Sequence, residues 1–444
     1  GGTIVLDAAK GATPGNVTLA SGVYSANAVG GNNNGGVVTV KGSQTLISGG
    51  GSVTLAANAS GNGTGGLVQL IATAPGSTAT IGSAAGQFVL NAFGGSANSA
   101  SRADGIEVRQ GGNLTVADVG SLDASALGAN GNGGNYILQA GSAGLGNLSV
   151  ASPINARGGG AGGLGSGQGG KVQLISNSTS AFVVNGGPAA NGIDGTVGAS
   201  GGLSGGSGGS VSIVNNNNGG ITLTNANDVT AAAPLTGAGD GGKIILNAAG
   251  GGAALAGDIT IPFGTMDVNA KGASFNGGTL DITGRNFVSP GVGPLNLIAN
   301  ATGSGNGGTV KFTTTSNTSD LTVGGGGDDS LCINATGGSA GSGAGDGGSI
   351  SVIAGRNVTV NNDPACLNAV ALGTNGAGAN LTLKAGNGAS GDLFVDLSLN
   401  ASGKGTGAGG AIALQTNSSS TFNIGTGSVS PGVNGTLTAV GGTG

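Results

Sequence analysis

The stretch GGKIILNAAGGGAALAGDITIPFGTMDVNA, residues 241–270, decides the fold expected for this chain. It contains three short runs in which apolar and polar side chains tend to alternate, at residues 243–247, 258–261 and 266–270. Glycine-rich segments separate these runs. Alternating runs of four or five residues bounded by such segments are typical of β-strands. The stretch therefore predicts a unit of three strands that opens with a Gly-Gly pair.

This unit recurs from one end of the sequence to the other. The first glycine of each opening pair, which we call the anchor, is Gly1, Gly35, Gly65, Gly111, Gly133, Gly169, Gly208, Gly241, Gly277, Gly307, Gly347, Gly378 or Gly409, where the copy at Gly378 is degenerate and has Ala379 as its second residue. Twelve intervals cover the 408 residues from the first anchor to the last, so the mean period is 34 residues. The intervals on either side of Gly111 are irregular, at 46 and 22 residues, and sum to two periods. Gly111 is therefore either an anchor or the start of a second strand.

Repeats of this kind predict an all-β, parallel β-helix (β-solenoid) with about three strands per coil, about 12 coils and little or no helix. One coil cannot bury its inward apolar face, but stacked coils form a continuous core. Strands of successive coils then lie ~4.8 Å apart. Glycine permits close backbone approach and tight corners, and stacked Asn side chains form ladders. We interpret residues 1–444 as a single solenoid domain of about 34-residue repeats.

The composition excludes several classes of function. The 444 residues include no His, 13 Lys and Arg, and 18 Asp and Glu, which gives a net charge of -5. Without His, the chain has no Ser-His-Asp triad and no His-ligated zinc site. Its few, scattered basic residues form no footprint for nucleic acid. No run of ~18 apolar residues predicts a membrane helix. We expect no catalytic residue, no metal site, no cofactor and no insertion into a membrane.

The acidic residues are the remaining candidates for chemistry. Glycosidases need two carboxylates that flank the substrate, whereas the adjacent pair Asp328-Asp329 lies in a Gly-rich loop without a basic neighbour. Asp240 and Asp346 each precede an anchor in the sequence GAGDGG. The nonapeptide pattern of calcium-binding β-rolls is absent. We interpret these two residues as solvated turn residues, with calcium binding as the alternative, and predict that the protein is not an enzyme.

The two cysteines occupy equivalent places in successive repeats. Cys332 and Cys366 are 34 residues apart, and each is followed by an aliphatic residue, Asn and Ala. Equivalent residues on neighbouring coils lie ~4.8 Å apart, within the ~4.4–6.8 Å range of disulfide Cα atoms. We predict a disulfide, which indicates an oxidising, extracellular setting. Two buried, reduced thiols are the alternative.

Several units resemble the repeats of filamentous-haemagglutinin-like exoproteins of two-partner secretion. The segments that carry the resemblance are residues 241–248, 257–261, 266–270, 120–125 and 153–158. The resemblance covers nearly the whole chain, through degenerate motifs. It implies a right-handed parallel β-helix that is exported to the bacterial surface and serves in adhesion and surface fibres. The amino-terminal secretion domain of that family is not recognisable in this sequence, which leaves the export route open.

Both ends of the sequence lie within the repeat pattern. Solenoids normally carry polar caps, and an uncapped end presents unpaired backbone groups to another chain. One hypothesis is an end-to-end interface that generates a filament, and the other is that the sequence is a fragment of a longer chain. The residues expected at the end-to-end interface are Gly1, Gly2, Thr3, Ile4, Leu437 and Val440.

These features predict a structural protein of the cell surface. Its role would be that of an extracellular fibre subunit or an adhesin shaft that associates with itself. The alternative is a surface module that binds glycans through exposed Asn, Thr and Ser side chains. Aromatic residues make up only 2% of the chain, which argues against sugar stacking. Asn-x-Ser/Thr sequences, such as those at Asn113 and Asn357, are so frequent here that most arise by chance.

Overall fold

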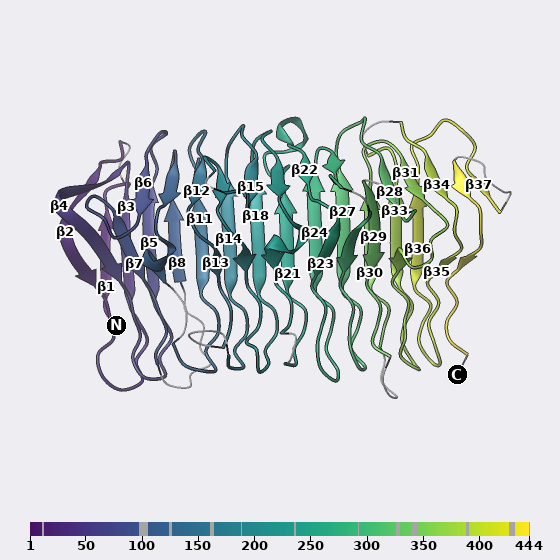
Figure 1. The fold of residues 1–444 in the computed structure, drawn as a ribbon, viewed down its shortest axis with the longest axis horizontal. Coiled ribbons are helices and arrows are strands. Elements are labelled where there is room, and N and C mark those ends of the chain that lie inside the picture. The colour runs from purple at the N-terminus through teal and green to yellow at the C-terminus, as the bar shows by residue number, and fades with distance from the viewer. Residues whose placement is uncertain are drawn as a thin grey trace. The chain divides into compact units, whose positions relative to one another are not determined.

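The computed structural model describes residues 1–10, 13–96, 105–123, 127–159, 164–187, 189–234, 237–291, 293–325, 329–339, 345–387, 390–425 and 431–443. Backbone contacts divide the chain into two compact units, Gly1–Gly219 and Gly220–Gly444. Each unit is a stack of parallel β-coils (Figure 1), with about 12 coils in the two units together. The prediction of an all-β solenoid with almost no helix is confirmed. The single domain expected from the repeats stays a prediction.

The elements of the first unit follow one another coil by coil. The first two coils contain β1 (Thr3–Asp7), β2 (Val17–Ser25), β3 (Val37–Gly42) and β4 (Thr45–Ala56). The next two contain β5 (Leu67–Ala72), β6 (Ala79–Ile81), β7 (Phe88–Asn91), β8 (Gly105–Arg109), β9 (Leu114–Val116), the short 3-10 helix η1 (Val119–Ser121) and β10 (Leu122–Asp123). The last strands are β11 (Asn135–Gln139), β12 (Leu148–Val150), β13 (Ile154–Asn155), β14 (Lys171–Ser176), β15 (Phe182–Val184), β16 (Gly192–Ile193), β17 (Val197–Gly198) and β18 (Ser210–Asn215).

The second unit repeats the same arrangement. It begins with β19 (Ile221–Leu223), η2 (Ala226–Asp228), β20 (Val229–Thr230), β21 (Lys243–Asn247), η3 (Ala253–Leu255), β22 (Ile259–Thr260) and β23 (Gly264–Asp267). It continues with β24 (Thr279–Gly284), β25 (Phe287–Val288), β26 (Leu295–Ile298), β27 (Thr309–Thr314), β28 (Leu321–Val323), β29 (Ser330–Asn334), β30 (Ser349–Ile353), β31 (Val358–Val360) and β32 (Leu367–Asn368). It ends with β33 (Asn380–Lys384), β34 (Leu393–Val395), β35 (Leu399–Asn400), β36 (Ala411–Gln415), β37 (Asn423–Ile424), β38 (Gly432–Val433) and β39 (Leu437–Thr438).

The strands that open each coil form the most regular ladder of each unit. In the first unit they pair in parallel in the order β1, β3, β5, β8, β11, β14 and β18, and in the second in the order β21, β24, β27, β30, β33 and β36. Each of these strands follows a predicted anchor, with one exception. In the fourth coil the opening strand is β8, and the segment after Gly111 is β9, which lies in the second sheet of the coil. Gly111 is therefore the start of a second strand, the second of the two possibilities that its spacing allowed.

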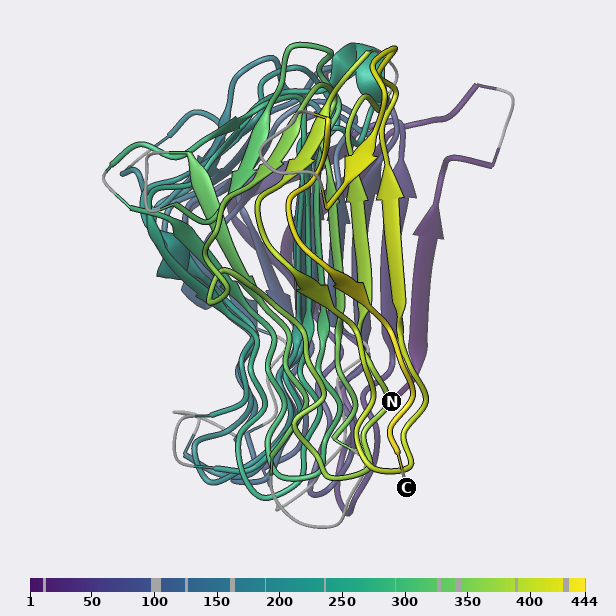
Figure 2. The same ribbon diagram turned by 90° about the vertical axis from the view of Figure 1, so that its right-hand side faces the viewer.

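Close backbone contact explains the Gly-Gly anchor at Gly277 and Gly278. A Cβ atom on Gly277 would overlap the carbonyl oxygen of Ala299, and one on Gly278 would overlap the carbonyl oxygen of Gly242. Ala299 lies in the same coil as Gly277, and Gly242 lies in the preceding one, so the backbone is crowded both within a coil and between coils, where only glycine fits without a shift. The loops that carry the anchors gather at one side of the coil (Figure 2).

Inward-facing side chains of successive strands form apolar columns inside each unit. Val38, Val68 and Ile106 occupy one register position in the first unit and are 0–1% exposed. Phe312, in β27, is buried and meets the ring of Phe287 edge-on, with centroids 5.0 Å apart and planes at 77°. Leu, Ile, Val and Ala side chains fill most of this interior.

Candidate functional site

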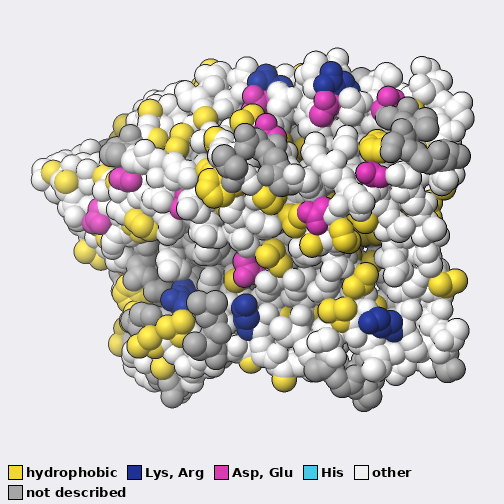
Figure 3. Space-filling model, turned by 45° about the vertical axis from the view of Figure 1, so that its right-hand side comes forward, with side chains coloured by type: hydrophobic (Ala, Val, Ile, Leu, Met, Phe, Trp, Pro, Cys, Tyr) yellow, Lys and Arg dark blue, Asp and Glu magenta, His cyan; other side chains and the backbone are white. Residues whose placement is uncertain are grey.

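Charged groups are sparse and spread over the surface, as Figure 3 shows for one face. Within the described residues, no three acidic or Cys side chains lie close enough together to hold a metal ion. In that same part of the chain, no helix has the length and apolar character needed to cross a membrane. The chemically distinct features are instead repeated side-chain contacts between coils.

Asn and Asp side chains before the anchors form a hydrogen-bonded ladder in the second unit. The Oδ1 atom of Asp240 accepts the backbone N–H of Asn276 (2.8 Å), whose Oδ1 accepts that of Asn306 (2.8 Å). Asn306 Oδ1 accepts the N–H of Asp346 (3.1 Å), and Asp346 Oδ1 accepts that of Ala377 (2.7 Å). Asp240 and Asp346 are thus half-buried members of a ladder. The structure adds, to the solvated turn positions that the sequence predicts, the role of acceptor for a backbone N–H of the next coil.

In the anchor loops of the first unit, Asn side chains likewise accept backbone N–H groups of the next coil. Asn34 Oδ1 accepts the N–H of Thr64, and Asn132 Oδ1 accepts that of Gln168, each at 2.9 Å. These side chains satisfy backbone donors that would otherwise lack a partner in the loop. The stacked Asn side chains that the composition predicted are therefore present in both units.

A second ladder lies just before the strands of another sheet and includes the Asn-x-Ser/Thr sequences at Asn113 and Asn357. In the first unit, Asn113 Oδ1 accepts the N–H of Asn147 (2.8 Å). In the second unit, Asp320 Oδ1 accepts the N–H of Asn357 (3.1 Å), and Asn357 Oδ1 accepts that of Asp392 (2.8 Å). The side chains of Asn113 and Asn357 thus have a structural role at these corners.

Two Arg–Asp pairs join neighbouring coils of the second unit and were not anticipated from the sequence. Arg285 binds Asp258 through two hydrogen bonds of 2.9 Å, and Arg356 binds both oxygens of Asp320. The hydrogen bond from Arg285 holds the pKa of Asp258 below its ordinary value, and Arg356 does the same for the pKa of Asp320. In the sequence, an Arg-Asn dipeptide follows each of these two Asp residues by about one period, and this pattern could have indicated the pairs.

Of the adjacent acidic pair, Asp328 lies outside the described residues, and only Asp329 can be placed. Asp329 has a left-handed backbone conformation (φ 56°), and its Oδ1 accepts the N–H of Ser289. Its carboxylate thus fixes a corner of the neighbouring coil.

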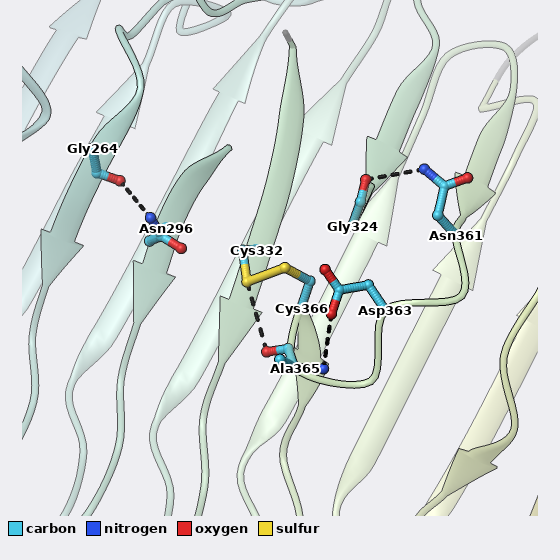
Figure 4. The surroundings of a disulfide bond; sticks show 8 residues. All are labelled: Gly264, Asn296, Gly324, Cys332, Asn361, Asp363, Ala365 and Cys366. Carbon is cyan, nitrogen blue, oxygen red and sulfur yellow. Dashed lines mark hydrogen bonds between the residues drawn. A yellow bond between two sulfur atoms is a disulfide. The ribbon is translucent and has the colours of Figure 1, made fainter. Parts of the chain in front are cut away.

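Cys332 and Cys366 form a disulfide with Cα atoms 4.0 Å apart. The register that pairs Ile333 of β29 with Leu367 of β32 places the two cysteines opposite each other. Both are buried, at 7% and 5% exposure. In Figure 4 the corner that runs from Asn361 through Asp363 to Cys366 lies beside the bond. The disulfide therefore links two successive coils, as the 34-residue spacing predicted.

The six residues expected at an end-to-end interface lie in the two different units. Thr3 and Ile4 belong to β1 and pair with Val37 and Val38 of β3. The amino group of Gly1 donates to the carbonyl of Asn34, at 2.5 Å. The remaining residues of the set are Gly2, next to β1, Leu437, in β39 and 38% exposed, and Val440, which is 62% exposed. A contact between these two groups stays a prediction.

Comparison of the chain with protein-family models, with curated proteins and with solved structures finds no match. The resemblance to filamentous-haemagglutinin-like repeats consequently stays an expectation, and the function has to be argued from the coils themselves.

Proposed function

We propose that this protein is a structural element of the cell exterior, the shaft of a fibre or adhesin. The observation that carries the proposal is the continuity of the contacts between coils. Within each unit, parallel backbone pairing, Asn and Asp ladders and a continuous apolar core join successive coils. Such a stack resists bending and local opening, because most of the strands that open the coils are paired on both sides.

Two further features suit an exposed shaft outside the cell. The disulfide between Cys332 and Cys366 is a bond that persists in oxidising compartments and is rare in the cytosol. The chain also has only 13 Lys and Arg residues, so trypsin-like proteases find few cleavage sites. Extended, paired backbone further limits cleavage, because proteases act on locally opened chain.

The proposal includes self-association, which is supported by the edge of β1 that does not face β3. Strand β1 pairs with β3, and its other edge offers backbone groups to a further strand, whichever chain supplies it. Val5 of β1 is 55% exposed beside that edge. Sedimentation of the purified chain at increasing concentration tests this part, and a single monomeric species at all concentrations would exclude it.

The main proposal is tested on intact cells that produce the protein. Antibody labelling seen by electron microscopy is expected to mark extended structures outside the cell, and added protease is expected to reach them. Recovery of the protein in the cytosol alone would refute the proposal. A glycan array tests the alternative role, and saturable binding that depends on one outer face would favour a glycan-binding module instead.

A further inference from the structure

The interface from β32 to β35 in the second unit lacks the hydrogen bonds that join the coils on either side of it. At the two interfaces that flank it, the third strand of one coil donates backbone N–H groups to the next coil at every second residue. From β29 to β32 and the segment after it, the donors are Ile333, Ala335 and Gly337, and the acceptors are Cys366, Asn368 and Val370 (2.8–3.1 Å). From β35 to β39 and the segment after it, the donors are Leu399, Ala401 and Gly403, and the acceptors are Thr436, Thr438 and Val440 (2.7–2.9 Å).

The interface between these two, from β32 to β35, has no such bonds. The equivalent donors are the N–H groups of Leu367, Ala369 and Ala371, all described and buried. The structure gives them no partner among Ser398, Asn400 and Ser402, and β32 and β35 do not pair. Buried backbone groups without a partner are rare in folded proteins, so an unpaired row of them marks a place where something else can bind.

The break is local and has a cause in the length of the corners. On the other two sides of the same coils, β30 pairs with β33, and β31 pairs with β34. Six residues, 361–366, join β31 to β32, but only three, 396–398, join β34 to β35. Three residues of extended chain span about 10 Å. The shorter corner therefore draws β35 out of line with β32.

A cavity of about 270 Å³ occupies the break. Leu367, Leu381 and Leu399 contribute apolar surface, Asn368 and Asn400 contribute amides, and no lining residue carries a charge. On its opposite edge β32 is held to β29 by the disulfide between Cys332 and Cys366. The open edge therefore belongs to a strand that is covalently fixed in place.

We propose that this open edge and its cavity bind an uncharged, extended polypeptide segment that adds to β32 as a further strand. Donors on alternate residues, ~6.6 Å apart, match the spacing of carbonyl groups along a β-strand. The apolar part of the cavity accepts one aliphatic side chain of that segment. The uncharged lining disfavours a charged one, because burial without a partner is costly. This inference goes beyond the structural role and does not depend on it.

The probe is the peptide acetyl-Ser-Leu-Asn-Ala-Ser-amide, which repeats residues 398–402 of the chain itself. Its binding to the full-length, oxidised protein is measured by calorimetry. Hydrogen exchange at Leu367, Ala369 and Ala371 is measured with and without the peptide. We expect saturable binding with a Kd of about 1 mM or lower and at least tenfold slower exchange at these three amides.

The matched variant is Ala369→Pro, which removes an N–H that has no partner in the structure and follows a residue in extended backbone. It is expected to weaken binding at least tenfold. Pro364→Trp, at an exposed lining position, blocks the cavity without removing a ladder donor. It tests the same binding site if Ala369→Pro does not fold. Three results would each overturn the proposal: no saturable binding, slow exchange at the three amides before peptide is added, or equal binding by the wild type and both variants.

Discussion

Reduction of the disulfide between Cys332 and Cys366 is expected to loosen one coil of the second unit selectively. The bond closes a loop of 34 residues. Loop-closure entropy for that length is about 13 cal/mol/K, which corresponds to about 4 kcal/mol at 25 °C. Strand β32 depends on this bond more than other strands do, because it pairs with β29 on one side and with no strand of the following coil on the other.

The effect is measured by hydrogen exchange of the amides that β32 protects. Ile333 and Ala335 donate their N–H groups to the carbonyls of Cys366 and Asn368, at 2.9 and 2.8 Å. Opening of the coil that the disulfide closes exposes both amides. A change of about 4 kcal/mol corresponds to about a thousandfold faster exchange in the reduced protein, as an upper limit, since β32 alone frees a shorter segment than the whole loop.

The internal control is Ala26 of the first unit, whose N–H donates to the carbonyl of Ala56 at 2.8 Å. In a repeat protein each coil contacts its neighbours only, so exchange at Ala26 should not change on reduction. The double variant Cys332→Ala with Cys366→Ala should behave like the reduced protein. If reduction accelerates exchange at Ile333 and Ala335 by less than tenfold, the disulfide is not what holds β32, and the reasoning fails.

Three further outcomes are expected. Gly277→Ala places a methyl group on a neighbouring carbonyl and should lower the free energy of unfolding by about 1–3 kcal/mol in chemical denaturation, whereas Gly144→Ala, with open space around its Cα, should change it little. Asn306→Ala removes a ladder acceptor and should cost about 1 kcal/mol, seen as faster exchange of the amide it binds, while Asn306→Asp keeps the acceptor and most of the protection. The lowered pKa of Asp258 means that its pair with Arg285 contributes stability above about pH 4 and loses it as the pH falls through that pKa. The difference in Tm between the wild type and Arg285→Gln should therefore be present at pH 7 and vanish near pH 2, and an equal difference at both pH values would contradict this.

The repeat pattern by itself determined the solenoid, the positions of most opening strands and the cysteine pair. It could do so because each coil contacts only its neighbours, so one period of sequence translates directly into one layer of structure. The Gly-Gly anchors and the frame around Cys332 and Cys366 are local features that repeat in step with that period.

The tertiary structure decided the features that depend on how two coils align. The opening strand β8 has no Gly-Gly pair, and only its pairing with β5 and β11 shows that it takes the place expected of the segment after Gly111. The Asp258–Arg285 pair and the open edge of β32 likewise result from corner lengths that differ between coils. The register between two coils depends on the corner lengths of both coils and on packing across the core. The sequence of a single repeat contains neither.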